Sequence, residues 1–190
     1  MEKLCFELML VRHAESEGNV DPDAGKKYDF GNTPLSAHGL CQARLVGERL
    51  SHGKISAVYH SPLERAKATA VQIIQRQSET PVVVAFGDLV ETDTYREESA
   101  EEKRQRAKNC IDEVRNRYSN GETVLFVTHG TFISYLMREA LEIADAGLRF
   151  SAYNTGVTKI KFYGNGEVKL SYANDTSHLY ADKNDLAFLV

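Results

Sequence analysis

Short runs of apolar, β-branched residues alternate along this chain with longer amphipathic stretches, and this alternation restricts the possible folds most. We predict strands at 4–11, 55–59, 82–86, 123–128, 157–163 and 167–172. We predict helices at 36–53, 63–74, 97–118 and 131–143, with a loop between the first strand and the first helix. Strands joined through helices run parallel, so the pattern predicts an α/β three-layer sandwich with a mostly parallel central sheet and helices on both faces. A Gly-Asn-Gly turn at 164–166 predicts a C-terminal antiparallel hairpin.

The size and charge of the chain narrow its class further. A length of 190 residues fits a single domain over 1–190 that buries a core without a metal or disulfide. A net charge of −4 argues against nucleic acid as the main partner, although a local basic pocket can still bind a small anion. No apolar run approaches the roughly 20 residues of a membrane span, and no signal-peptide pattern opens the chain. We therefore expect a soluble, cytoplasmic protein with no membrane partner, and no feature predicts an oligomeric state.

The number and spacing of the cysteines also indicate a cytoplasmic protein. Cys5, Cys41 and Cys110 are odd in number and widely spaced, with no Cys-x-x-Cys pair. We predict that they are reduced, buried thiols.

Cationic and imidazole side chains follow three of the predicted strands. Arg12 and His13 end the first strand, Arg65 follows the second, and His129 ends the fourth. Ligands of open parallel sheets bind at the carboxyl ends of the strands. We therefore expect these four side chains to share one pocket.

A phosphomonoester explains why these residue types would be gathered. The phosphoryl group carries about two negative charges near pH 7, and the guanidinium forks of Arg12 and Arg65 suit its oxygens. A histidine is a nucleophile only when its ring is neutral, and adjacent cations favour the neutral ring, which fits His13 beside Arg12. His129 would stabilise the charge that develops on the transferred group.

The same reaction needs a carboxylic acid. This group protonates the leaving oxygen, and as a carboxylate it then activates water. The loop after the third strand carries two candidates, Glu91 and Asp88, of which we favour Glu91.

Four segments in order resemble the signatures of the histidine phosphatase superfamily, also called phosphoglycerate mutase-like. Residues 10–19, LVRHAESEGN, resemble its Arg-His-Gly-x-Ser/Thr-x-x-Asn motif, with Ala14 in place of the glycine. Residues 61–70, SPLERAKATA, match its Ser-Pro-Leu-x-Arg-Ala-x-x-Thr-Ala motif, and 127–130, VTHG, match the third. Leu89-Val90-Glu91 resembles the site of the acid/base glutamate.

The resemblance implies a role for each matched residue. His13 would be phosphorylated, with His129 and the arginines as the other catalytic residues and Glu91 as the proton donor. No metal or cofactor would be needed. The residues it assigns to the phosphate are Arg12, Asn19, Arg65, His129 and Gly130, the last through its backbone N–H.

Departures from the family pattern bear on the reaction. Residues 92–98, TDTYREE, replace the family's Gly-x-Trp-Glu-Gly element, and Gly18 stands where the mutases usually carry tryptophan. The mutases are also typically longer over the site. A short cap around 87–118 would leave the pocket open to water, which favours a metal-independent phosphatase acting on a small phosphomonoester through a phosphohistidine at His13. The alternatives are phosphoglycerate mutase-type phosphoryl transfer and a weakly catalytic, phospho-ligand-binding regulator.

Other polar and aromatic residues are weaker candidates for binding the rest of a substrate. Solvation explains the basic ones, because the 97–118 helix is charged on all sides. The aromatic residues either line the mouth of the pocket or pack a loop. For Asn154 and His178 the alternative to binding is a purely structural role. These candidates are Lys26, Lys27, Arg96, Lys103, Tyr28, Phe30, Tyr95, Asn154 and His178.

Overall fold

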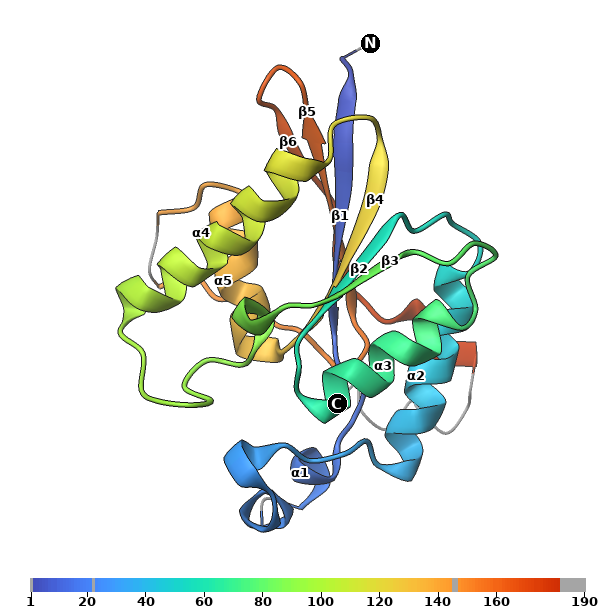
Figure 1. Cartoon of the computed structure of the whole chain (residues 1–190), viewed down its shortest axis with the longest axis vertical. Helices are drawn as coiled ribbons and strands as arrows, with labels where there is room; N and C mark the ends of the chain where they lie inside the picture. Colours follow the sequence, from blue (N-terminus) through green and yellow to red (C-terminus); the bar gives the residue numbers. More distant parts are fainter. Residues whose placement is uncertain (1, 22, 145–146, 182–190) are drawn as a thin grey trace.

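The central feature of the computed structural model is one six-stranded sheet, in the order β3-β2-β4-β1-β5-β6 (Figure 1). The structure describes residues 2–21, 23–144 and 147–181. The first four strands in this order are mutually parallel, whereas β5 and β6 are antiparallel and form the C-terminal hairpin. The strands are β1 (Leu4–Arg12), β2 (Ala57–His60), β3 (Val82–Ala85), β4 (Glu122–Thr128), β5 (Val157–Tyr163) and β6 (Val168–Asp175). The predicted fold class is confirmed.

Helices cover both faces of this sheet (Figure 1). On one face lie α2 (Ala37–Leu50) and α3 (Glu64–Ile74), and on the other α4 (Ala100–Arg117) and α5 (Gly130–Ala140). The segment predicted as a loop contains α1 (Glu17–Val20) and two single 3₁₀ turns. Two more 3₁₀ turns, Gly87–Leu89 and Ser177–Ala181, follow β3 and β6.

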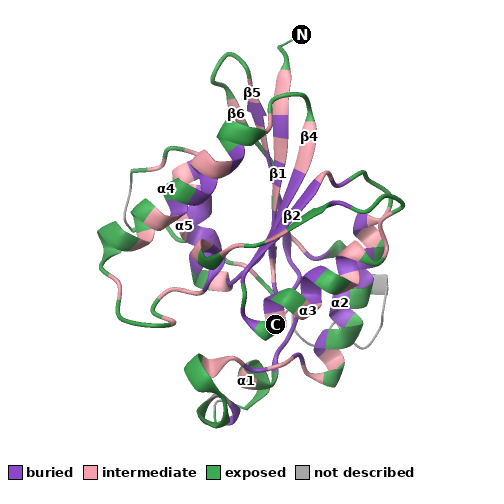
Figure 2. Ribbon diagram, viewed as in Figure 1, coloured by how far each residue is buried: buried purple, intermediate pink, exposed green. Residues whose placement is uncertain are grey.

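The pleat of β1 divides its side chains between two hydrophobic layers. Leu8 and Leu10 are buried against α4 and α5, whereas Val11 packs with the side chains of α2 and α3. A strand covered on both faces needs apolar residues at nearly every position, which explains its continuous apolar run. Figure 2 shows the buried residues along the strands and the inner sides of the helices.

Serine caps set the starts of two helices. The Ser36 side chain accepts a hydrogen bond from the backbone N–H of Gly39 at 2.9 Å, which fixes the start of α2. Ser99 and Glu102 form a reciprocal capping box, so α4 begins at Ala100 and not at the predicted residue 97.

Gly39 also lets α2 approach the loop after β1. A Cβ atom at this position would lie 1.9 Å from the carbonyl oxygen of Glu15. The Glu15 carboxylate in turn accepts a hydrogen bond from the Ser36 hydroxyl at 2.5 Å. The loop that leaves His13 is therefore fixed against the start of α2.

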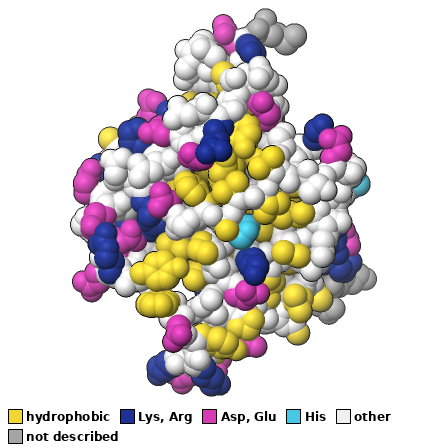
Figure 3. Space-filling view, in the orientation of Figure 1, with side chains coloured by type: hydrophobic (Ala, Val, Ile, Leu, Met, Phe, Trp, Pro, Cys, Tyr) yellow, Lys and Arg dark blue, Asp and Glu magenta, His cyan; other side chains and the backbone are white. Residues whose placement is uncertain are grey.

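β3 is an edge strand and differs from the other parallel strands in its exposure. Val82 and Val83 are 61% and 47% exposed. Figure 3 shows apolar side chains across the middle of one molecular face and charged side chains around its rim. The cysteines are only partly as predicted, because Cys110 is buried, Cys5 is half-buried and Cys41 lies exposed on α2. Within the described ranges, no helix is both long and apolar enough to cross a membrane.

Candidate active site

The ends of two neighbouring parallel strands bring the two predicted histidines together. Arg12 at the end of β1 pairs in register with Thr128 at the end of β4. The backbone N–H of His13 donates to the Thr128 carbonyl at 2.9 Å. The next residue on each strand is a histidine, and the ring centroids of His13 and His129 lie 5.0 Å apart. Residues 116 positions apart in the sequence thus meet because their strands are adjacent.

The two ring nitrogens of His13 have different hydrogen-bond partners. Nδ1 lies 2.7 Å from the Ala14 carbonyl oxygen, so Nδ1 carries the proton and donates it there. Nε2 lies 3.2 Å from Nε of Arg65, which donates to it. The Nε2 lone pair therefore faces the cationic side of the pocket.

The surroundings of His13 favour the neutral ring. Burial and the nearby guanidinium groups of Arg65 and Arg12 lower the pKa of His13 well below its usual 6.5. Burial, His13 and the arginines lower the pKa of His129 in the same way. Both rings are almost fully buried, at 3% and 0% exposure.

The two arginines approach the histidines from different elements. Arg65, on the first turn of α3, also donates to the Gly31 carbonyl at 3.0 Å. Arg12 donates to the Ala152 carbonyl at 2.9 Å, while its buried Nε has no hydrogen-bond partner among the described residues. Burial lowers the pKa of each arginine, and nearby Glu91 opposes this change, but guanidinium remains charged at any physiological pH.

His129 is positioned by a residue whose role the sequence did not predict. Its Nε2 lies 2.9 Å from the Ser61 hydroxyl, and no residue in the described part of the chain forms a hydrogen bond with its buried Nδ1. Ser61 is the first residue of the Ser-Pro-Leu motif at the end of β2. The motif therefore predicted where Ser61 lies but not its contact with His129.

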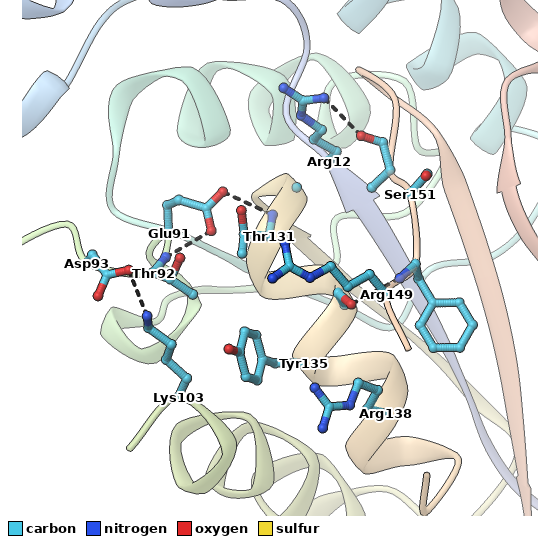
Figure 4. A pocket seen from close by; sticks show the side chains of 14 residues that line it. Arg12, Glu91, Thr92, Asp93, Lys103, Thr131, Tyr135, Arg138, Arg149 and Ser151 are labelled. Carbon is cyan, nitrogen blue, oxygen red and sulfur yellow. Dashed lines mark hydrogen bonds and ion pairs between the residues drawn. The ribbon is translucent and has the colours of Figure 1, made fainter. Parts of the chain in front are cut away.

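Glu91 lies at the N-terminus of α5. Its carboxylate accepts hydrogen bonds from the backbone N–H groups of Thr92, Thr131 and Phe132 at 2.8, 3.1 and 3.0 Å. These donors hold the carboxylate in the same cavity as Arg12 (Figure 4).

Asp88 does not line this cavity. It borders a different, smaller cavity, and its charge acts on the Cys110 thiol of α4. The geometry therefore favours Glu91 over Asp88 as the acid/base group.

Two predicted phosphate contacts lie at the rim. Asn19 is exposed, and its side-chain oxygen accepts hydrogen bonds from the N–H and hydroxyl of Ser16 at 3.1 and 3.2 Å. Gly130 begins α5 beside Arg12, where a Cβ atom would lie 3.4 Å from the arginine Nε. Asn154, a weaker candidate, donates to the His13 carbonyl at 2.9 Å and so adjoins the site.

The alanine that replaces the family's glycine fits without strain. Ala14 is fully buried, its φ is not positive, and its N–H donates to the Thr69 hydroxyl at 3.0 Å. Thr69 lies one helical turn after Arg65 and donates to the Arg65 carbonyl at 2.7 Å. The loop after β1 and the first turn of α3 are thus joined directly.

The weaker basic candidates separate by their partners. Lys26 pairs with Asp23 on the surface at 2.6 Å, and Arg96 pairs with Glu102 at 2.8 Å. Lys103 pairs with Asp93 at 2.7 Å and lines the cavity of Arg12 and Glu91.

The aromatic candidates pack loops. Phe30 and Tyr95 contact each other edge to face, with ring centroids 5.1 Å apart. The Tyr28 hydroxyl donates to Glu17 at 3.1 Å.

The cavity extends well beyond the predicted residues. Its volume is about 560 Å³, and its far side is formed by Tyr135 and Arg138 of α5 and by Arg149 of the following loop (Figure 4). The sequence carries no signal for these residues, because neither arginine follows a strand or belongs to a motif. Within the described part of the chain, no three His, Cys, Asp or Glu side chains are grouped to hold a metal ion.

The family follows from comparison with known proteins. The model of the histidine phosphatase superfamily (branch 1) matches residues 8–93 and 84–175. The chain belongs to the histidine phosphatase superfamily.

Relatives in this family differ in how much of their length the chain matches. Phosphoserine phosphatase 1 of Hydrogenobacter thermophilus is 31% identical over 64% of this chain and 70% of its own. The uncharacterized phosphatase PhoE of Bacillus subtilis is 33% identical over 68% of this chain and 75% of its own. A probable phosphatase of Schizosaccharomyces pombe is 31% identical over 75% of this chain, which spans only 59% of that relative's length.

Solved structures share the fold at lower identity. A mycobacterial glucosyl-3-phosphoglycerate phosphatase superposes with a TM-score of 0.74 at 21% identity, covering 88% of this chain and 98% of that one. A phosphoserine phosphatase of Entamoeba histolytica, in complex with 3-phosphoglyceric acid, gives 0.68 at 22% identity, covering 92% and 99%.

Proposed function

We propose that this protein is a metal-independent phosphatase that hydrolyses a small phosphomonoester through a phosphohistidine at His13. The observation that carries the proposal is the pair of contacts on the His13 ring. Nδ1 donates its proton to the Ala14 carbonyl, so Nε2 is unprotonated and accepts a hydrogen bond from the Arg65 guanidinium, in the position of a nucleophile. A neutral histidine next to two permanent cations can attack a phosphorus atom whose oxygens those cations bind.

In the first step, the His13 Nε2 lone pair forms a bond to phosphorus, and the bond from phosphorus to the leaving oxygen breaks. Arg12 and Arg65 bind the non-bridging oxygens and offset their charge. Protonated Glu91 gives its proton to the leaving oxygen, which departs as an alcohol.

In the second step, water attacks the phosphohistidine. Glu91, now a carboxylate, takes a proton from the water as its oxygen bonds to phosphorus. The P–N bond breaks, its electron pair returns to Nε2, and inorganic phosphate leaves. Glu91 and His13 are then both restored.

The names of relatives further support hydrolysis of a small substrate. Several relatives are named phosphatases, among them phosphoserine phosphatases of Hydrogenobacter thermophilus and Arabidopsis thaliana. We also propose that residues 1–190 act as one domain. Of the predicted cap around 87–118, α4 packs on the sheet with its buried side chains in the core, so the short cap is limited to 87–99 and the start of α4. A short cap leaves water free to compete as phosphoryl acceptor, which favours hydrolysis over mutase-type transfer.

Trapping the intermediate tests the proposal. Protein mixed rapidly with a ³²P-labelled phosphomonoester and quenched in alkali is expected to carry label on His13, because phosphohistidine is stable in base and labile in acid. The His13→Ala protein is expected to carry none. The Lys54→Ala protein, changed at an exposed surface residue, is the matched control and should label like the wild type.

The same samples separate the alternatives. Label that turns over to inorganic phosphate without an added bisphosphate primer supports the phosphatase. Label that forms only after such a primer is added indicates a mutase. No label with excess substrate would refute the catalytic proposal and favour a binding protein.

A further inference from the structure

The cavity that contains Arg12 and Glu91 continues to a second cluster of cations. Arg138 lies on α5 one turn beyond Tyr135, and Arg149 reaches in from the loop that follows α5 (Figure 4). The cavity therefore has two ends, one at the proposed phosphate site and one at Arg138 and Arg149.

Within the described residues, the two arginines at the far end have no anionic partner. Nε of Arg138 is buried without a hydrogen-bond partner, and its guanidinium packs on the Tyr135 ring, 5.7 Å from the centroid. Among the residues that the structure describes, no side-chain hydrogen bond or ion pair involves Arg149. Lys103, in the same wall, differs because Asp93 binds it at 2.7 Å.

The carboxylates of the cavity are already engaged elsewhere. Glu91 is bound by backbone N–H groups at the start of α5, and Asp93 is bound by Lys103. Guanidinium is charged at any physiological pH, so among the described residues no carboxylate of this cavity neutralises the positive charges of Arg138 and Arg149. A concave surface lined by one sign of charge concentrates ligands of the opposite sign.

We propose that the substrate carries a second anionic group, a carboxylate or a second phosphate, which Arg138 and Arg149 bind. This inference rests on the proposed function, because it assumes that the phosphate to be cleaved occupies the Arg12 end. Guanidinium forks match the oxygens of either anion. A cavity of about 560 Å³ lies within the range of small-ligand sites, so both anions belong to one small molecule.

Pairs of esters that differ in one charge test this specificity. The first pair is 3-phosphoglycerate and glycerol 3-phosphate, and the second is fructose 1,6-bisphosphate and fructose 6-phosphate. A charge-assisted contact predicts that kcat/KM is at least about tenfold higher for the doubly anionic member of one pair. The pair that shows the preference identifies the anion as a carboxylate or a phosphate.

Variants assign that preference to the far end of the cavity. Arg149→Met and Arg138→Met keep the apolar stems, remove the charges and are expected to bring the ratio close to one. Arg44→Met is the matched control, because Arg44 is an exposed arginine on α2 paired with Glu48, and it should keep the wild-type ratio. Ratios near one in wild-type protein, or wild-type ratios in both cavity variants, would overturn the inference.

A binding measurement separates this inference from the proposed function. Calorimetry on His13→Ala protein compares the affinities of the same esters without any turnover. Preferential binding of the doubly anionic ester without hydrolysis by the wild-type protein would support the second-anion site and refute the phosphatase. Hydrolysis of both members of each pair with equal affinities would refute the second-anion site alone.

Discussion

The two nitrogens of the His13 ring have unequal environments, and the proposed chemistry depends on that difference. The Ala14 carbonyl oxygen lies 2.7 Å from Nδ1 and keeps the proton on that nitrogen. Nε2 can therefore react without first losing a proton. The same burial and cations that lower the pKa of His13 keep the ring neutral at pH values below 6.5. Each residue around the ring thus either orients it or keeps it uncharged.

Replacing one atom of Glu91 tests the proton transfer. Glu91→Gln keeps one oxygen, which can still accept from the N–H groups of Thr92 and Phe132 that share Oε1, but it cannot donate the carboxylic proton. Turnover of an alkyl phosphate is expected to fall by roughly 10² to 10⁴, because that is the usual contribution of a positioned general acid. Steady-state kcat measures this loss.

Asp88→Asn is the matched control for Glu91→Gln. Asp88 lies on the same loop but outside the cavity, so this variant should retain turnover. Near-normal turnover of Glu91→Gln together with a large loss in Asp88→Asn would reverse the assignment.

At the scale of elements, the largely buried Arg106 of α4 contacts the segment that carries Glu91. Arg106 forms two hydrogen bonds with the Glu98 carboxylate, at 2.9 and 2.7 Å, and both side chains are only 12% exposed. The same guanidinium donates to the carbonyls of Asp88 and Val90 at 2.8 Å and lies 4.0 Å from the Phe132 ring centroid. The position of Glu91 therefore depends on a helix that does not itself line the phosphate end.

Removing this arginine is expected to affect stability and catalysis together. Arg106→Met leaves the largely buried Glu98 without its cationic partner, which costs up to about 3 kcal/mol of unfolding free energy. It also removes the hydrogen bonds that hold the carbonyls of Asp88 and Val90, just before Glu91. We therefore expect the fold-decrease in kcat to be larger than the fold-change in KM. Urea unfolding and steady-state kinetics measure the two effects.

Arg104→Met controls for the loss of an arginine from α4, because Arg104 is exposed on the same helix. It should change neither quantity appreciably. An Arg106→Met protein with wild-type kcat would show that Glu91 keeps its position without this contact.

For the whole molecule, three buried histidines couple folding to pH. Burial lowers the pKa values of His13 and His129, and burial together with Arg49 lowers that of His178 to about 4. In the unfolded chain each histidine titrates near its ordinary value of 6.5. As pH falls below 6.5, the unfolded chain binds protons first, and the folded state loses stability.

His178 allows this loss to be measured apart from catalysis. Its ring contacts the Thr155 hydroxyl at 2.9 Å and Arg49 at 3.2 Å, contacts that a glutamine can retain. Wild-type unfolding free energy is expected to decrease between pH 6.5 and 4 by up to about 1.4 kcal/mol per pH unit for each histidine. The His178→Gln protein should show a shallower slope in urea unfolding across this range.

His52→Gln, at an exposed histidine, is the control for this experiment and should keep the wild-type slope. Identical slopes in wild-type and His178→Gln proteins would contradict the buried, neutral state of His178.

The order of strands and helices was predictable because local patterns specify it. Apolar runs with two covered faces and the Gly-Asn-Gly turn each act over a few residues, and both gave elements close to those observed. The sequence also placed Arg12, His13, Arg65 and His129 at one edge, because strand ends carry that information. The start of α4 was wrong by three residues, because the capping box of Ser99 overrides the helical character of 97–99.

Contacts between distant segments were decided only by the tertiary structure. The tautomer of His13, the contact of Ser61 with His129 and the proposed choice of Glu91 over Asp88 rest on distances that no local pattern encodes. Arg106, Arg138 and Arg149 look like solvated charges in the sequence, because a guanidinium reveals its partners only after helices and loops have packed. The sequence by itself thus determined the family, the fold and the strand ends that bring the proposed reacting residues together, whereas packing decided the shape and charge of the cavity around them.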